Sequence, residues 1–167
     1  MKIKNIFALA IFGTIALTSC NKDKNRVEDF SYAFNTGQVD ASYAYDGTHA
    51  STLSADLTLE GQKEGTMITL TLNNTIDGEM YATHAHDAAD PAVTPNMTPY
   101  DETPNGDVWV QMIAGNGGSV SASQMSSMSV TELTETYEGF LVVHDPLQGI
   151  TTTDPTTYVI LGSFARN

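Results

Sequence analysis

The sequence predicts an all-β domain, a Greek-key β-barrel or sandwich of about eight strands. Two observations support this fold class. Short segments in which apolar and polar residues alternate, such as 52–59 and 67–72, recur between turns rich in Gly, Asn and Asp. No segment keeps a helical period for long. The stretch 121–133 could hold a turn of helix, but serine and threonine dominate it and disfavour a helix.

The expected strands share this alternation or consist of a short apolar run between turns. They are 41–45, 52–59, 67–72, 80–86, 107–114, 120–125, 127–133, 139–144 and 158–164. The turn EGQKEG at 60–65 joins the second and third of these strands into a hairpin. The stretch 87–106 is rich in Pro, Asp and Asn, and we expect it to be a long loop.

The first twenty residues have the composition of an export signal that ends at a cysteine. Lys2 and Lys4 form a positive region, 6–16 is almost wholly apolar, and the sequence LTS precedes Cys20. The apolar segment is shorter than the roughly 20 residues of a membrane-spanning helix. This ending resembles the lipobox of bacterial lipoproteins, which implies that Cys20 receives diacylglycerol and becomes the mature N-terminus. The alternative is an ordinary signal peptide with a chance cysteine.

The expected order along the chain is therefore a lipoprotein signal peptide at 1–19, a lipidated tether at 20–33 and one β domain at 34–167. Such a protein lies in the cell envelope, anchored by lipid to a bacterial membrane on its periplasmic or surface face. Cys20 is the one cysteine of the chain. Once it carries lipid, no thiol remains for a disulfide, even in an oxidising compartment.

The charge of the chain excludes some partners. The formal net charge is -13, and from Glu28 onward 19 acidic residues face only Lys63 and Arg166, which gives 2 − 19 = −17. A surface of this kind repels nucleic acid and anionic lipid headgroups. We expect contact with the membrane through the lipid alone, and the sequence indicates no particular protein partner.

Four histidines are the candidate chemical groups of the domain. His84 and His86 lie two residues apart in an expected strand, so both imidazoles project from one face and could hold copper or zinc. His144 ends the apolar run 140–143, where a polar residue is unexpected. The plain alternative is that these are polar residues on a solvated strand face. His49 lies in an expected turn and is predicted to be an ordinary surface residue.

Two histidine segments carry a resemblance to a known family. The segment MYATHAHD at 80–87 resembles the first copper-ligand strand of the copper/zinc superoxide dismutases, and LVVHD at 141–145 is similar to a later ligand strand. The resemblance extends over 39–164 and implies a dismutase-like fold with His84, His86 and His144 as copper ligands. The chordin-type (CHRD) domain also has a His-X-His strand and a later Val-His, and it remains the alternative family.

The chain also departs from the dismutase pattern. That family has a histidine that bridges copper and zinc, with two more histidines and an aspartate at the zinc, but no histidine lies between His86 and His144 here. Asp107 alone matches a zinc ligand, so we do not expect a zinc site. The residues Thr156 and Thr157 stand where the family places an arginine that attracts superoxide.

Three functional hypotheses follow from these matches and departures. The first is copper binding through the three histidines, for buffering or delivery in the envelope. The second is superoxide dismutation by a copper-only site, and the third is an interaction domain that binds no metal. Met97, Met125 and Met128 could add soft thioether ligands for Cu(I), or they could simply fill gaps in a β core.

The lipobox resemblance generates the first prediction. Replacing Cys20 with Ser should block lipid attachment and release the protein from the membrane fraction, because the thiol is the attachment point. Labelling with radioactive fatty acid measures this. A Cys20→Ser variant that still incorporates label would contradict the lipoprotein hypothesis.

Overall fold

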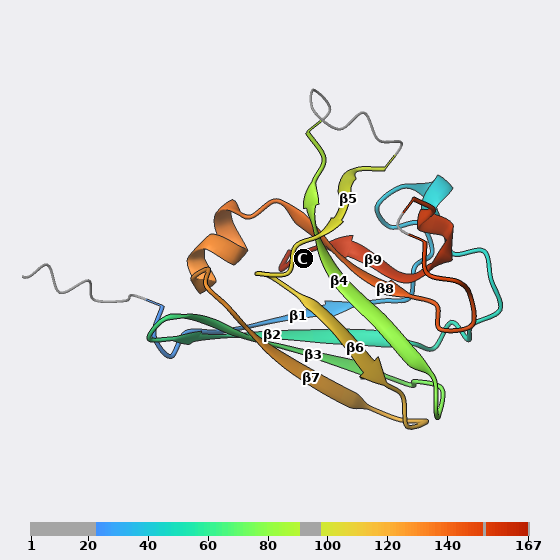
Figure 1. Cartoon of the computed structure of the whole chain (residues 1–167), viewed down its shortest axis with the longest axis horizontal. Helices are drawn as coiled ribbons and strands as arrows, with labels where there is room; N and C mark the ends of the chain where they lie inside the picture. The colour runs from blue at the N-terminus through green and yellow to red at the C-terminus, as the bar shows by residue number, and fades with distance from the viewer. Residues whose placement is uncertain (1–22, 91–97, 152, 167) are drawn as a thin grey trace, which may run out of the picture.

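The computed structural model describes residues 23–90, 98–151 and 153–166, and over these residues the chain is all-β. Nine strands form two antiparallel sheets that lie face to face (Figure 1). This confirms the predicted fold class in its sandwich form. The expected signal peptide and Cys20 lie outside the described residues. Within these residues, no helix combines the length and apolar character needed to cross a membrane.

The first sheet has the strand order β1-β2-β3-β7. Its strands are β1 (Val27–Tyr32), β2 (Ser54–Gln62), β3 (Gly65–Asn73) and β7 (Val120–Ser126). Strict alternation forms this sheet, because Leu57 and Leu59 of β2 and Ile68 and Leu70 of β3 are buried while their neighbours face outward. The hairpin between β2 and β3 is confirmed, and Gly65 turns it with a positive φ of 99°.

The second sheet is built around β4 (Met80–Ala88). Along one edge, β4 pairs first with β6 (Val110–Ala114) and then with β5 (Tyr100–Pro104). Along the other edge it pairs with β8 (Gly139–His144), which in turn pairs with β9 (Tyr158–Ser163). β4 is therefore the strand that the rest of this sheet surrounds.

The connection from β6 to β7 crosses between the sheets. β7 lies beside β3 in the first sheet, while β6 lies beside β4 in the second. No ladder joins β6 to β7 within the described residues, so the sheets do not close into a barrel there. Instead the Gln124 side chain of β7 accepts hydrogen bonds from the Val110 backbone N–H (3.1 Å) and the Gln111 side-chain amide (3.0 Å).

Two apolar clusters bury both faces of the second sheet. The main core lies between the sheets and includes Tyr81, Trp109, Leu141 and Val143. A smaller cluster lies on the outer face of the second sheet and comprises Tyr100, Val142, Tyr158 and Leu161, with Val39, Tyr43 and Phe140 packed against it. Tyr43 belongs to the 3₁₀ helix η1 (Ala41–Tyr43), which contacts a second one, η3 (Pro155–Thr157).

Three sequence-based expectations about individual elements are wrong. The segment 41–45 is not a strand, because the Asp40 side chain accepts from the backbone N–H of Ser42 and starts η1 instead. The segment 127–133 leads into a π-helical turn, η2 (Glu132–Thr136), and Ser129 bonds to the Glu132 carboxylate at its start. The expected loop at 87–106 contains β5.

The expected tether at 20–33 is also wrong over much of its length. Within it, Val27–Tyr32 forms β1, which pairs with β2 and buries Phe30 and Tyr32. Asp23 is buried as well, and its carboxylate accepts hydrogen bonds from the backbone N–H (3.0 Å) and hydroxyl (2.8 Å) of Thr131. The folded domain therefore includes Asp23, close to the position of the expected lipid anchor.

This contact generates a stability prediction. Asp23→Ala should lower the free energy of unfolding by about 1–3 kcal/mol, because it removes a buried acceptor from two hydrogen bonds. The backbone N–H of Thr131 lowers the pKa of Asp23. The contribution of Asp23 is therefore present above the unfolded carboxyl pKa and is lost as the pH falls through the folded value. Chemical denaturation at about pH 7 and about pH 3 measures both effects.

Glu64→Ala is the matched control, since Glu64 is a surface carboxylate beside Lys63 with 86% of its side chain exposed. It should change the free energy of unfolding by less than about 0.5 kcal/mol. Equal losses in the two variants would contradict a structural role for Asp23.

Candidate metal centre

The ladder between β4 and β8 brings the three predicted histidines to one face. His84 pairs with Val142 and His86 pairs with Phe140, so these four side chains lie on the same side of the sheet. His144 lies two residues beyond Val142 and therefore shares that side. The opposite side carries Tyr81, Ala85 and Leu141, which belong to the main core. The histidines thus occupy the outer face of the second sheet, beside the smaller apolar cluster.

His84 is the central member of the cluster. Its ring centre lies 5.7 Å from that of His86 and 5.1 Å from that of His144. Two imidazoles bound to one trigonal metal ion, with metal–nitrogen bonds of about 2 Å, have ring centres roughly 5.5 Å apart. The two ring spacings that involve His84 are thus close to what a shared metal ion requires.

The histidine nitrogens are not arranged as a metal site in this structure. Among the described residues, no group of three or more His, Cys, Asp or Glu side chains has the geometry to hold a metal ion as it stands. Suitable ring spacing alone therefore does not make a metal site, because the ligand nitrogens must also converge on one point.

The histidine nitrogens lack partners although they are buried. His86 is fully buried and His144 is 2% exposed, while His84 is half-buried. Nδ1 of His84, Nε2 of His86 and both nitrogens of His144 have no hydrogen-bond partner among the described residues. A buried polar atom without a partner costs about 1–3 kcal/mol, and native proteins contain few of them. Four such atoms in one cluster are therefore a marker of function.

His86 is held in place by the backbone of β5, a strand that the sequence did not predict. Its Nδ1 lies 2.8 Å from the backbone carbonyl of Asp101 in β5, and a proton on Nδ1 would leave Nε2 free as a ligand atom. A carbonyl partner of this kind fixes the ring orientation of many metal-binding histidines. No sequence signal marked Asp101, because β5 is only five residues long and holds two acidic residues and a proline.

Two buried tyrosines pack against the cluster on the same outer face of the sheet. Tyr100 of β5 packs on His86 and Tyr158 of β9 packs on His144, with ring centres 5.1 and 4.8 Å apart. The Tyr100 hydroxyl donates to the Tyr158 hydroxyl at 3.0 Å. Burial raises the pKa of Tyr158 to about 12 and raises that of Tyr100 further. Both phenols therefore stay protonated and form a neutral wall behind the histidines.

Burial keeps the histidines neutral. It lowers the pKa of His84 to about 4 and that of His144 to about 3, and the neighbouring histidines add to both shifts. Burial also lowers the pKa of His86, although its bond to the Asp101 carbonyl and the nearby acidic side chains act in the opposite direction. Neutral imidazole is the form that binds metal, so the free ligands need not lose a proton at neutral pH.

The fourth histidine is not the surface residue that the sequence suggested. His49 is 6% exposed, with Nε2 2.8 Å from the Tyr81 hydroxyl and Nδ1 2.9 Å from the Ala50 carbonyl. Its backbone N–H donates to the Tyr45 hydroxyl, which donates to Asp145. The expectation fails because an aromatic hydroxyl that is distant in sequence meets the ring. Both nitrogens of His49 have protein partners, in contrast to those of His144.

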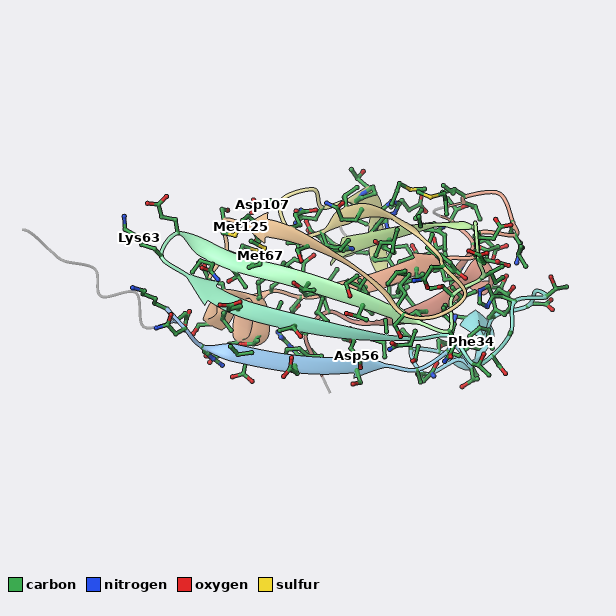
Figure 2. The ribbon with its side chains drawn as sticks, turned by 90° about the horizontal axis from the view of Figure 1, so that it is seen from below. Phe34, Asp56, Lys63, Met67, Asp107 and Met125 are labelled. Carbon is green, nitrogen blue, oxygen red and sulfur yellow. The ribbon has the colours of Figure 1, made fainter. Side chains whose placement is uncertain are left out.

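The other residues considered as ligands lie elsewhere. Met125 is opposite Met67 on the first sheet, and Asp107 accepts from the Ser127 hydroxyl at 2.7 Å near the same end of that sheet (Figure 2). Met128 packs against the main core, as the gap-filling alternative expects. Met97 lies outside the described residues. Thr156 and Thr157 form part of η3.

The cationic side chain nearest the C-terminus is engaged away from the histidines. Arg166 donates to the backbone carbonyls of Leu133, Thr134 and Tyr137 around η2. The charges that act on His86 come from Asp101, Asp87 and Glu102, all acidic. An anion that approaches the cluster from this side would meet negative potential.

Comparison with known proteins adds no relative: no protein-family model, no curated protein and no solved structure matches the chain. The similarity to the dismutases therefore depends on the histidine segments quoted above.

The depressed pKa values generate a prediction for the metal-free protein. The unfolded chain binds protons to histidine near pH 6.5, whereas folded His84 and His144 bind them only near pH 4 and 3. The free energy of unfolding should therefore fall as the pH drops below about 6.5, by up to about 1.4 kcal/mol per pH unit for each of the two groups. Denaturant titrations between about pH 4 and pH 7 measure this slope.

The variant His84→Gln/His144→Gln removes two of the three histidines with a lowered pKa and should reduce the slope in this pH range. A slope that is unchanged by the double substitution would show that other groups cause the pH dependence.

Proposed function

We propose that this protein is an envelope lipoprotein that binds one copper ion through His84, His86 and His144. The observation that carries the proposal is the set of buried imidazole nitrogens without partners on one face of the sheet. A structural role would satisfy these atoms, as it does for both nitrogens of His49. A metal ion would instead satisfy one nitrogen of each ring.

The donor set fits copper better than harder cations. Imidazole suits copper and zinc, whereas magnesium and calcium require oxygen ligands. The orphaned atoms support Nδ1 of His84, Nε2 of His86 and one nitrogen of His144 as the ligand nitrogens. Three neutral donors add no negative charge, which suits the monovalent cuprous ion. When bound, copper supplies the ability to change oxidation state by one electron.

Copper buffering or delivery is favoured over superoxide dismutation. A dismutase must attract a small anion, but the side chains that influence His86 are acidic and Arg166 is bound at η2. Steering by charge changes association rates by about 10- to 1,000-fold, and this arrangement would act against superoxide. Copper cations, by contrast, would be attracted to the acidic domain.

The expected lipid on Cys20 would give this function a location. Because the folded domain includes Asp23, only a short segment would separate it from the membrane surface. The copper site would then stay close to the membrane surface. A membrane protein that exports or imports copper could exchange metal with the domain there.

The copper-binding proposal generates a stoichiometry prediction. The full-length protein in detergent, loaded with copper and then dialysed, should retain one copper per chain, and His144→Ala should lose most of it, because two imidazoles compete poorly with water and buffer. Metal analysis by mass spectrometry measures the content. The same sample should show dismutase activity far below that of a complete copper/zinc enzyme.

His49→Gln is the matched control. It should retain copper, although it should lower the free energy of unfolding by about 1–3 kcal/mol through the lost hydrogen bond to Tyr81. A wild-type protein that retains no copper would refute the proposal and favour an interaction domain. Rapid, salt-sensitive dismutation by the loaded protein would favour the enzyme instead.

A further inference from the structure

The outer face of the second sheet carries an exposed methionine pair next to the histidines. Met80 of β4 is 46% exposed and Met112 of β6 is 52% exposed, and Val110 beside them is 38% exposed. Methionine is usually a buried residue that fills gaps in a core. These two side chains fill none, so their exposure calls for another explanation.

The strand register places this pair in contact range of the cluster. β4 and β6 pair without a bulge, with Met80 opposite Ala114, Ala82 opposite Met112 and His84 opposite Val110. Residues two apart on one strand share a face, so Met80 and His84 lie on the same side as Met112. Met112 is thus a diagonal neighbour of both, at about 7–8 Å between backbone positions, which long side chains span.

The two methionines and His84 therefore form a line that runs from solvent into the metal centre. Ala82 lies between Met112 on one side and the strand of His144 on the other, and its small side chain leaves the space above it to its neighbours. His84 is the least buried of the three histidines. The methionines therefore neighbour the most exposed of the three histidines.

We infer that Met80 and Met112 form an acceptor site for cuprous ion, from which copper passes to His84. The inference rests on the proposed copper site and adds its route of loading. Thioether sulfur is a soft ligand that selects Cu(I) over harder cations. The transfer is a ligand exchange in which a Cu(I)–S bond breaks as a Cu(I)–N bond to His84 forms. No electron moves, because copper remains Cu(I) before and after the exchange.

A second methionine pair on the same chain provides the comparison. Met67 and Met125 lie directly opposite each other on the outer face of the first sheet, and Met125 is 45% exposed (Figure 2). Their row continues with Glu60 and Val27 and contains no histidine. This pair has the same side-chain chemistry and one member, Met125, of similar exposure, but no imidazole to receive the metal.

The test is the rate of copper transfer under anaerobic, reducing conditions. Full-length protein in detergent is mixed with Cu(I) held by a coloured bidentate chelator, and the loss of colour reports transfer. Met80→Leu/Met112→Leu should slow the transfer at least about tenfold, as loss of a supporting ligand shell does, without changing the final copper content. Met67→Leu/Met125→Leu should load at the wild-type rate. Leucine keeps the volume of methionine, so the fold should tolerate both double substitutions.

A second measurement keeps this inference separate from the proposed function. Silver(I) is a redox-inert probe of soft ligands, and it should shift the ε-methyl NMR signals of Met80 and Met112 in the wild-type protein. Equal transfer rates for the two double variants, or methyl signals that silver leaves unchanged, would overturn the acceptor site. Failure of the wild type to retain copper while silver shifts both methyl signals would refute the three-histidine site and leave the soft site standing.

Discussion

The antiparallel ladder between β4 and β8 is the constraint on which both the core and the histidine cluster depend. Side chains alternate between the faces of a sheet, so a slip of one residue would exchange every inward side chain for an outward one. His84 and His86 would then enter the main core, and Tyr81 and Ala85 would leave it. The register with His84 opposite Val142 thus fixes the apolar interior and the histidine cluster at once.

The unpartnered histidine nitrogens lower the stability of the fold, and the surrounding residues keep water away from these nitrogens. Buried imidazoles without partners destabilise a fold, and water would remove that cost if the face were open. The smaller apolar cluster keeps water out where Tyr100 packs against His86 and Tyr158 packs against His144. Within the phenol pair, the Tyr100 hydroxyl donates to the Tyr158 hydroxyl, which satisfies the Tyr100 donor. The result is a set of neutral nitrogens held ready for a ligand.

The sequence predicted those parts of the fold that depend on local patterns. Strong alternation predicted β2 and β3, a short apolar run predicted β8, and the period of two predicted that His84 and His86 share a face. Contacts between distant segments were beyond local reasoning. β5 forms because Tyr100 and the Asp101 carbonyl pack on His86, and β1 forms because Phe30 and Tyr32 find the core. The burial of His49 likewise depends on Tyr81, 32 residues away. Nothing in the pattern around these residues indicates such partners.

The two sides of the cluster differ in a way that suggests a direction for metal exchange. On the side of His86, β5 and the phenol pair close the site, and the Asp101 carbonyl fixes one ligand in place. On the side of His84, β6 presents the flexible thioether of Met112 to solvent. Exchange through the first side would require strands to separate. Exchange through the second requires only rotations of side chains, which are far faster than the opening of a sheet. Copper that reaches the histidines, or leaves them, should therefore pass over β6.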